Sequence, residues 1–243
     1  MYYLGQESDI TSYTKHFLQL LKEYYSDIYK DSSIQSADRG GRKCDFIIYC
    51  GKNKELQHNA TLMMLDSIVN GIKDCAARYV DAVTSGHAFN PDISSIRSKI
   101  MVKLVNSEYY ALHYPEAFET KIKNTEFTVV FVVLDQDRQV ILDEFDIRFL
   151  SAGNTQELIQ TAYKNTMESI DFRMYSSASP QSVHKGHAGY RFTASDPEDF
   201  SATALLFQAK YLCERLHTSI FIFPWTTRLA FAIPGKVQKS DRW

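Results

Sequence analysis

The segment that most constrains the fold is the apolar run Phe127–Leu134, which has the sequence FTVVFVVL. A strand with one face in water alternates apolar and polar residues, and this run does not alternate. Uninterrupted, β-branched apolar runs are typical of strands that are covered on both faces. We therefore predict that the run is a central strand, and that residues 140–142 pair back to it across a turn.

The first third of the chain predicts a helix, a β-hairpin and a longer helix. Apolar residues recur at helical spacing over residues 10–28. The sequence DRGGRK at 38–43 contains the paired glycines that a tight turn needs, so residues 33–50 predict a hairpin. Over 59–84, apolar residues alternate at three- and four-residue spacing. This seam predicts one long helix in the core, with dimerisation through the seam as the alternative.

The remainder of the chain predicts shorter elements of both kinds. After the break SGHAFNPD, Asp92 can cap a short helix through SSIRSKIMVKLV, and Asn154 with Glu157 has the spacing of a capping box. Strand-like DFRMY and YRFTA flank the Ser/Gly-rich residues 176–189. A helix opened by SDPEDF follows, and then the strands SIFIFPW and RLAFAIP.

These elements predict an α+β fold. An N-terminal helix, β-hairpin and long helix are followed by a mixed-sheet lobe with two further helices. The break after residue 86 places a boundary between an N-terminal lobe, 1–88, and a C-terminal lobe, 89–243. The two lobes either fold separately or form one continuous domain.

Composition narrows the functional classes. The 27 basic residues nearly cancel the 29 acidic ones, so no overall field attracts nucleic acid or an anionic membrane. The 15 tyrosines and 15 phenylalanines suit a large core and also protein interfaces. The chain has no secretory signal, no membrane-spanning run and no Cys-x-x-Cys pair, which predicts a cytoplasmic protein with reduced thiols.

The order of motifs in the second half resembles a bacterial family of unknown function, the YtpQ-like proteins. The motifs are a strand ending FVVLD, a helix NTQELIQTAYKNTM, a strand GYRF, an acid-opened helix containing SATALLF and the closing IFPWTTRLAFAIP. The resemblance covers roughly residues 95–235 and implies a bacterial protein with a similar fold. It implies no activity.

Two acidic residues, Asp135 and Asp137, follow the predicted central strand. Carboxylates at a strand end can hold Mg²⁺ for hydrolase or nuclease chemistry. Aspartate is also the residue expected where a strand enters a turn, because its side chain caps nearby backbone groups. A nuclease core would in addition need Glu119 and Lys121 on a strand, and EAFETKIKN does not predict one.

Two further candidate sites are basic. His184 and His187 lie in the loop HKGHAGYRF and supply two metal ligands, where zinc needs at least three from protein. Arg39, Arg42 and Lys43 at the hairpin tip can contact an anion, an acidic protein face or nucleic acid.

The function predicted from these features is a cytosolic bacterial binding or protein-interaction module without its own catalysis or cofactor, which contacts a protein partner or itself. The alternative is a hydrolase or nuclease that depends on a divalent metal, with Asp135 and Asp137 holding Mg²⁺. No membrane contact is expected.

Overall fold

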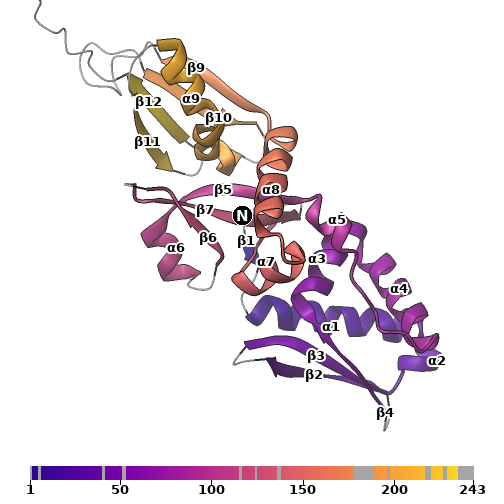
Figure 1. Cartoon of the computed structure of the whole chain (residues 1–243). Coiled ribbons are helices and arrows are strands. Elements are labelled where there is room, and N and C mark those ends of the chain that lie inside the picture. Colours follow the sequence, from indigo (N-terminus) through magenta and orange to yellow (C-terminus); the bar gives the residue numbers. More distant parts are fainter. Residues whose placement is uncertain are drawn as a thin grey trace, which may run out of the picture. The chain divides into compact units, whose positions relative to one another are not determined.

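The computed structural model describes most of the chain, and every structural statement below refers to that part. The described residues are 2–4, 7–39, 42–50, 53–114, 117–123, 125–135, 138–177, 189–195, 198–216, 220–226 and 229–234. They form helices together with mixed and antiparallel sheets, so the α+β class is confirmed (Figure 1). No helix among them is long and apolar enough to span a bilayer.

The chain divides into two compact units. Unit 1 comprises Met1–Met101 and Phe131–Ala162, and unit 2 comprises Val102–Val130 and Tyr163–Trp243. The predicted lobe boundary between residues 88 and 89 stays a prediction.

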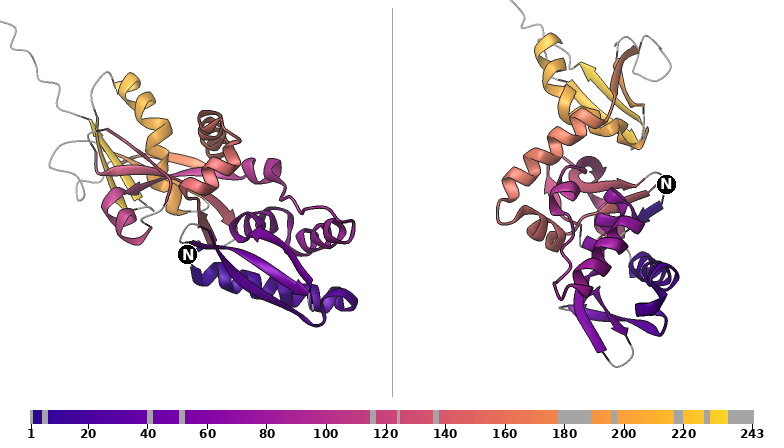
Figure 2. Two further views of the ribbon diagram at one scale, coloured as in Figure 1. Left: turned by 60° about the horizontal axis from the view of Figure 1, so that its bottom comes forward. Right: turned by 90° about the vertical axis from the view of Figure 1, so that its right-hand side faces the viewer.

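Three helices of unit 1, α1, α3 and α4, cover one face of a three-stranded antiparallel sheet (Figure 1; Figure 2). The sheet has the order β2-β3-β4, and the predicted hairpin is its first pair, with Arg39 opposite Arg42. The strand β4 was not predicted. The elements are α1 (Glu7–Tyr24), α2 (Ser26–Tyr29), β2 (Ser32–Arg39), β3 (Arg42–Cys50), β4 (Asn53–Asn59), α3 (Ala60–Asn70), α4 (Ile72–Thr84) and α5 (Ile93–Arg97).

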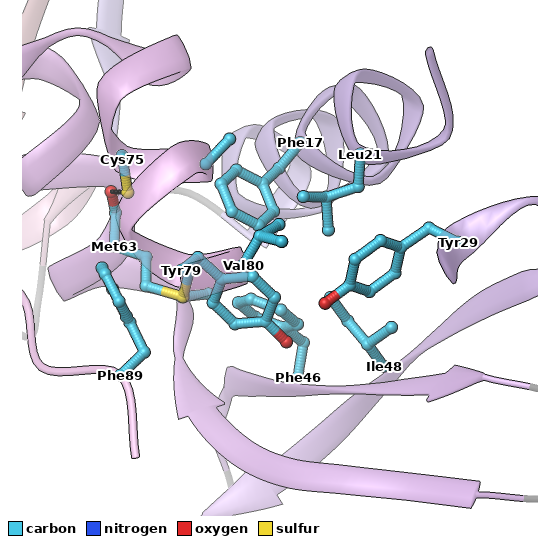
Figure 3. Close-up of a cluster of buried hydrophobic side chains, with 12 residues drawn as sticks. Phe17, Leu21, Tyr29, Phe46, Ile48, Met63, Cys75, Tyr79, Val80 and Phe89 are labelled. Carbon is cyan, nitrogen blue, oxygen red and sulfur yellow. Dashed lines mark hydrogen bonds between the residues drawn. The ribbon is translucent and has the colours of Figure 1, made fainter. Parts of the chain in front are cut away.

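Tyr79 lies at the centre of the core of unit 1 (Figure 3). Its ring contacts Phe17 edge-on at 5.5 Å between centroids and Phe89 at 5.6 Å. Phe46 and Ile48 contribute to the same cluster from the sheet. Offset and edge-on contacts of this kind stabilise aromatic cores beyond the burial of area.

The predicted long helix over 59–84 is two helices. Gly71 ends α3 and begins α4 with a φ of 92°, a left-handed conformation that glycine adopts without steric cost. The apolar residues of the predicted seam still face the core. Leu62, Leu65, Ala76 and Tyr79 are all buried within the chain.

The central strand prediction is confirmed. Strand β7 (Phe127–Asp135) lies in a mixed sheet of order β1-β8-β7-β5, and β6 (Glu119–Lys121) also pairs with β7. Strand β7 lies between β8 (Arg138–Ile141), to which it is antiparallel, and β5 (Ile100–Asn106). Strand β1 (Tyr2–Leu4) pairs with β8 in parallel. All residues from Thr128 to Val133 are buried, as the uninterrupted apolar run predicts.

The helix predicted after Asp92 ends early. Asp92 caps α5 as expected, since its Oδ1 accepts a hydrogen bond from the Ser95 amide at 3.0 Å. The following IMVKLV is strand β5, because this apolar run is buried over its whole length beside β7. A local helical pattern is here overridden by the sheet.

Two helices after residue 88, α6 and α7, were not predicted. The described part contains α5, α6 (Ser107–His113), α7 (Glu144–Ser151), α8 (Thr155–Ser169) and α9 (Ala204–Leu216). The predicted cap of α8 is present, because the Glu157 amide donates to Asn154 Oδ1 at 3.2 Å. A 3₁₀ helix, η1 (Glu198–Thr203), precedes α9 where an α-helix was predicted.

Unit 2 also contains a four-stranded antiparallel sheet of order β11-β12-β10-β9. Its strands are β9 (Phe172–Ser177), β10 (Gly189–Ala194), β11 (Ile220–Thr226) and β12 (Leu229–Pro234), and they match the four strands predicted for this part of the sequence. Helix α9 packs along β10, β11 and β12, at the gold and yellow end of the chain (Figure 2).

Side-chain hydroxyls cover the free edge of β5. The amide of Val102 donates to Thr166 Oγ1 at 2.8 Å, and the amide of Leu104 donates to Thr203 Oγ1 at 3.1 Å. Between them, the side chain of Lys103 is fully buried, with Nζ 5.3 Å from the centroid of the Phe200 ring. An edge strand covered in this way offers no row of free amides to another chain.

We expect Thr166→Val and Thr203→Val each to lower the free energy of unfolding by about 1–3 kcal/mol. Valine keeps the shape of threonine but leaves a buried amide without an acceptor. The matched control is Thr161→Val, whose hydroxyl donates to the Glu157 carbonyl on the solvent side of α8, and we expect about 0.5 kcal/mol or less. Denaturant unfolding of the three variants measures the difference, and equal effects at all three sites would contradict the edge-covering role.

Candidate functional site

One of the two strand-end acids, Asp135, is the last residue of β7. The main chain of Asp135 pairs with that of Arg138, which is the position expected for a turn-closing aspartate. The side chain of Asp135 and the whole of Asp137 lie outside the described residues. Asp143 and Asp146 follow shortly after and are used in a capping box at the start of α7, where each accepts a hydrogen bond from the other's amide.

The assumption that residues 119–121 are not a strand is wrong. They form β6, antiparallel to β7, because the short segment pairs with the buried strand. Glu119 and Lys121 form an exposed ion pair with 3.5 Å between Oε1 and Nζ. A nuclease core of this kind also needs an acid earlier in the chain, such as Asp45, and Asp45 belongs to β3 of a different sheet. The nuclease alternative stays a prediction.

The basic candidates are only partly described. Arg39, Arg42 and Lys43 lie on the two strands that flank the hairpin turn, and their side chains are outside the described part of the structure. His184 and His187 also lie outside it. Among the side chains that are described, no three histidine, cysteine, aspartate or glutamate residues come close enough to hold a metal ion.

A buried polar network joins the helices of unit 1. The fully buried carboxylate of Asp66 accepts from Arg78 at 2.7 Å, from Asn70 at 2.8 Å and from the Asp92 amide at 3.3 Å. Each oxygen is thus satisfied by groups of the same unit. Satisfied networks of this kind fix packing, so this cluster is structural.

Tyr13 and Cys75 border the Asp66 network, and neither is activated. The Tyr13 hydroxyl donates to the Met63 carbonyl at 3.0 Å and lies 2.7 Å from Ser67 Oγ. Burial raises the pKa of Tyr13 well above its usual range. Burial likewise raises the pKa of the Cys75 thiol to about 12. Neither group ionises near neutral pH, so neither is a nucleophile or general base there.

An exposed apolar surface lies on α6 of unit 2. Tyr109 and Leu112, three residues apart on one face of the helix, are 51% and 79% exposed. The opposite face is fixed by Tyr110, which is 3% exposed and packs 5.1 Å from the ring of Tyr114. We call Tyr109 and Leu112 the α6 surface.

The start of α6 is held rigidly. Asn106 caps the helix, with its Oδ1 accepting from the Tyr109 amide at 3.1 Å. The amide and hydroxyl of Ser107 both donate to the Glu126 carbonyl, at 2.9 and 3.0 Å, at the start of β7. The α6 surface is therefore presented from a fixed backbone, and a partner would order little more than two side chains on binding.

Comparison of the chain with family models, with curated proteins and with solved structures finds no match. The resemblance to the YtpQ-like proteins stays a prediction. The α6 surface was missed by the sequence patterns, although the run EYYALHY contains the signal: two aromatic residues and a leucine within one helical turn.

Proposed function

We propose that this protein is a non-catalytic interaction module of the bacterial cytosol that binds a protein partner through the α6 surface. The observation that carries the proposal is the pair Tyr109 and Leu112, exposed side by side on an anchored helix. Single exposed apolar residues are common on any protein, but a large aromatic and a leucine together can form the buried centre of an interface. Tyrosine in particular is enriched among residues that dominate binding energy.

The chemistry around the pair fits a protein partner. Glu108 and Ala111 lie on the same exposed side of α6, so a small apolar centre has a polar neighbour. This is the arrangement of apolar core and polar rim that protein interfaces share. Catalysis would need a nucleophile, a base or a metal site, and the titratable groups described above are engaged in caps, ion pairs or the core.

A photo-crosslinking amino acid at position 112, in cells that express the chain, tests this proposal. We expect one discrete protein adduct, and we expect Tyr109→Ser to reduce its yield about tenfold or more, as loss of a dominant interface residue does. The matched control is the same amino acid at Met167, which is 62% exposed on α8. The absence of an adduct at 112, or the same adducts from both positions, would overturn the proposal.

Tyr109→Ser and Leu112→Ser should leave stability nearly unchanged, because Leu112 lies mostly in water and Tyr109 is half exposed. We expect a change of about 0.5 kcal/mol or less in the free energy of unfolding. Thermal and denaturant unfolding therefore distinguish a lost interaction from a lost fold.

A further inference from the structure

Asn70 is the only asparagine in the sequence that is followed by glycine. In an Asn-Gly pair, the main-chain nitrogen of glycine can attack the side-chain carbonyl carbon of asparagine, because glycine has no side chain to obstruct the approach. The new N–C bond closes a succinimide ring, and the side-chain nitrogen leaves as ammonia. Water then opens the ring at either carbonyl and leaves aspartate or isoaspartate. The sequence therefore contains one favoured site of deamidation.

The structure places this pair at the junction of α3 and α4, where water can reach it. Asn70 is the last residue of α3, and Gly71 separates it from α4. Gly71 is exposed and Asn70 is half-buried. A Cβ at position 71 would meet no other part of the described chain within 4 Å. Neither burial nor crowding therefore prevents ring closure and hydrolysis at this junction.

Two hydrogen bonds engage the reacting groups in the folded state. The amide of Gly71 donates to the Ser67 carbonyl at 2.9 Å, and Nδ2 of Asn70 donates to Asp66 Oδ1 at 2.8 Å. Attack requires the Gly71 nitrogen to lose its proton, and a hydrogen-bonded amide does so mainly when the structure opens locally. Ring closure also requires a main-chain conformation outside the helical region, and Asn70 belongs to α3. The fold therefore protects the site until the junction opens.

Conversion of Asn70 to an acid disrupts the Asp66 network. The amide donor at position 70 becomes a second carboxylate, at hydrogen-bond distance from the fully buried Asp66. Like charges this close strongly disfavour one another in a buried site. Arg78, 2.7 Å from Asp66 Oδ2, is the one cation bound to Asp66 in the described part of the chain, and it then serves two carboxylates. The isoaspartate product also lengthens the main chain between α3 and α4.

We propose that Asn70 is a self-modification site of this protein. The folded state protects Asn70, opening of the junction between α3 and α4 exposes it, and the acid that forms destabilises unit 1. The step is one-way because ammonia is lost, so a chain that has opened for long enough is permanently marked and refolds poorly. Water is the only co-reactant. The inference concerns unit 1 alone and does not depend on the function proposed above.

Peptide mass spectrometry of the whole chain, aged in mildly alkaline buffer, measures the deamidation rate at each asparagine. In denaturant, Asn70 should react before any other asparagine. In native buffer its rate should be about tenfold lower or less, because only the opened fraction reacts. Arg78→Ala weakens the Asp66 network and should raise the native rate about tenfold, whereas the control Arg97→Ala should leave it unchanged. Equal rates with and without denaturant, or equal rates in the two arginine variants, overturn the proposal.

Asn70→Asp introduces the charge of the product without ageing. We expect the midpoint of thermal unfolding to fall by about 6 °C or more. The matched control is Asn154→Asp, since Asn154 also donates its side-chain amide to a carboxylate, Glu157, at 3.0 Å, but both residues are exposed. There we expect about 2 °C or less.

Asn70→Ser removes the donor without adding a charge, so its midpoint should lie between those of the wild type and Asn70→Asp. An Asn70→Asp midpoint close to that of the wild type, or no lower than that of Asn70→Ser, overturns the proposal. None of these results bears on crosslinking from position 112.

Discussion

Replacing Arg78 with alanine is expected to lower the free energy of unfolding by about 3 kcal/mol, far more than a half-exposed arginine usually contributes. The side chain of Arg78 is 40% exposed, but its partner Asp66 is 0% exposed. Without the guanidinium, the carboxylate keeps uncharged donors such as Asn70 and the Asp92 amide, so its charge remains buried without a positive partner among the described residues.

The control for this prediction is Arg97→Ala. Arg97 forms an ion pair of 3.1 Å with Glu157, and the Glu157 side chain is 57% exposed. An exposed pair of this kind contributes about 1 kcal/mol at most. If denaturant unfolding shows equal losses for the two arginine variants, the Asp66 network does not have the role assigned to it.

A double-mutant cycle isolates the interaction between Asp66 and Arg78. Asp66→Ala removes the buried charge together with its hydrogen bonds, so Arg78 then has nothing to neutralise. The double variant should therefore be more stable than the sum of the two single losses predicts, by about 1–3 kcal/mol. Strict additivity would contradict a direct interaction in solution.

Acid should destabilise unit 1 through His58. This imidazole is 7% exposed and lies between the rings of Tyr79, at 5.1 Å, and Phe46, at 5.7 Å. Its Nε2 has no hydrogen-bond partner among the described residues. Burial lowers the pKa of His58 from 6.5 to about 4, because the apolar surroundings disfavour the charged form.

Because the pKa of His58 is lower in the folded state than in the unfolded state, acid lowers the free energy of unfolding. The folded state binds the proton of His58 less readily than the unfolded state does, so stability is complete above about pH 6.5. It falls as the pH drops toward 4, where the loss reaches about 3 kcal/mol. His58→Phe keeps an aromatic ring between Tyr79 and Phe46 and should remove this part of the acid dependence.

Chemical denaturation between pH 7 and pH 4 measures the difference between the wild type and His58→Phe. The matched control is His16→Phe, since His16 is exposed on α1. That variant should follow the wild type across the range. Parallel pH profiles for the wild type and His58→Phe would show that His58 is not the group responsible.

The sequence predicted those elements whose signals are local. The run Phe127–Leu134 is apolar on both faces, and this alone indicates a central strand. The caps at Asp92 and Asn154 depend on residues three positions away, and both are present. The hairpin was recognisable because its turn chemistry is carried by two adjacent glycines.

Elements that depend on distant partners were not predictable. Residues 100–106 form a strand because they lie beside β7 and because hydroxyls 64 and 99 positions away in sequence accept from their amides. The division of the long helix depends on Gly71 adopting a left-handed conformation, which helical periodicity does not record. The hydroxyl of Ser201 accepts a hydrogen bond from the Ala194 amide at 2.8 Å, a contact that no local sequence pattern indicates.

The exposed residues of the candidate site also depend on distant packing, which the local sequence does not record. The two adjacent tyrosines of α6 are identical in sequence terms, yet Tyr110 is buried and Tyr109 is exposed. Which of them faces solvent is decided by the packing of the helix on the rest of unit 2. Charged clusters such as Asp143 and Asp146 are conspicuous in sequence, and the structure uses them to cap a helix.

The covering of β5 by η1 has a consequence for synthesis on the ribosome. Thr203 follows Leu104 by 99 residues, so β5 leaves the exit tunnel long before its second hydroxyl acceptor has been made. During that interval the nascent chain carries an apolar strand with an open edge, the kind of segment that aggregates or recruits a chaperone. Translation speed between these two residues is therefore a variable on which the yield of native protein should depend.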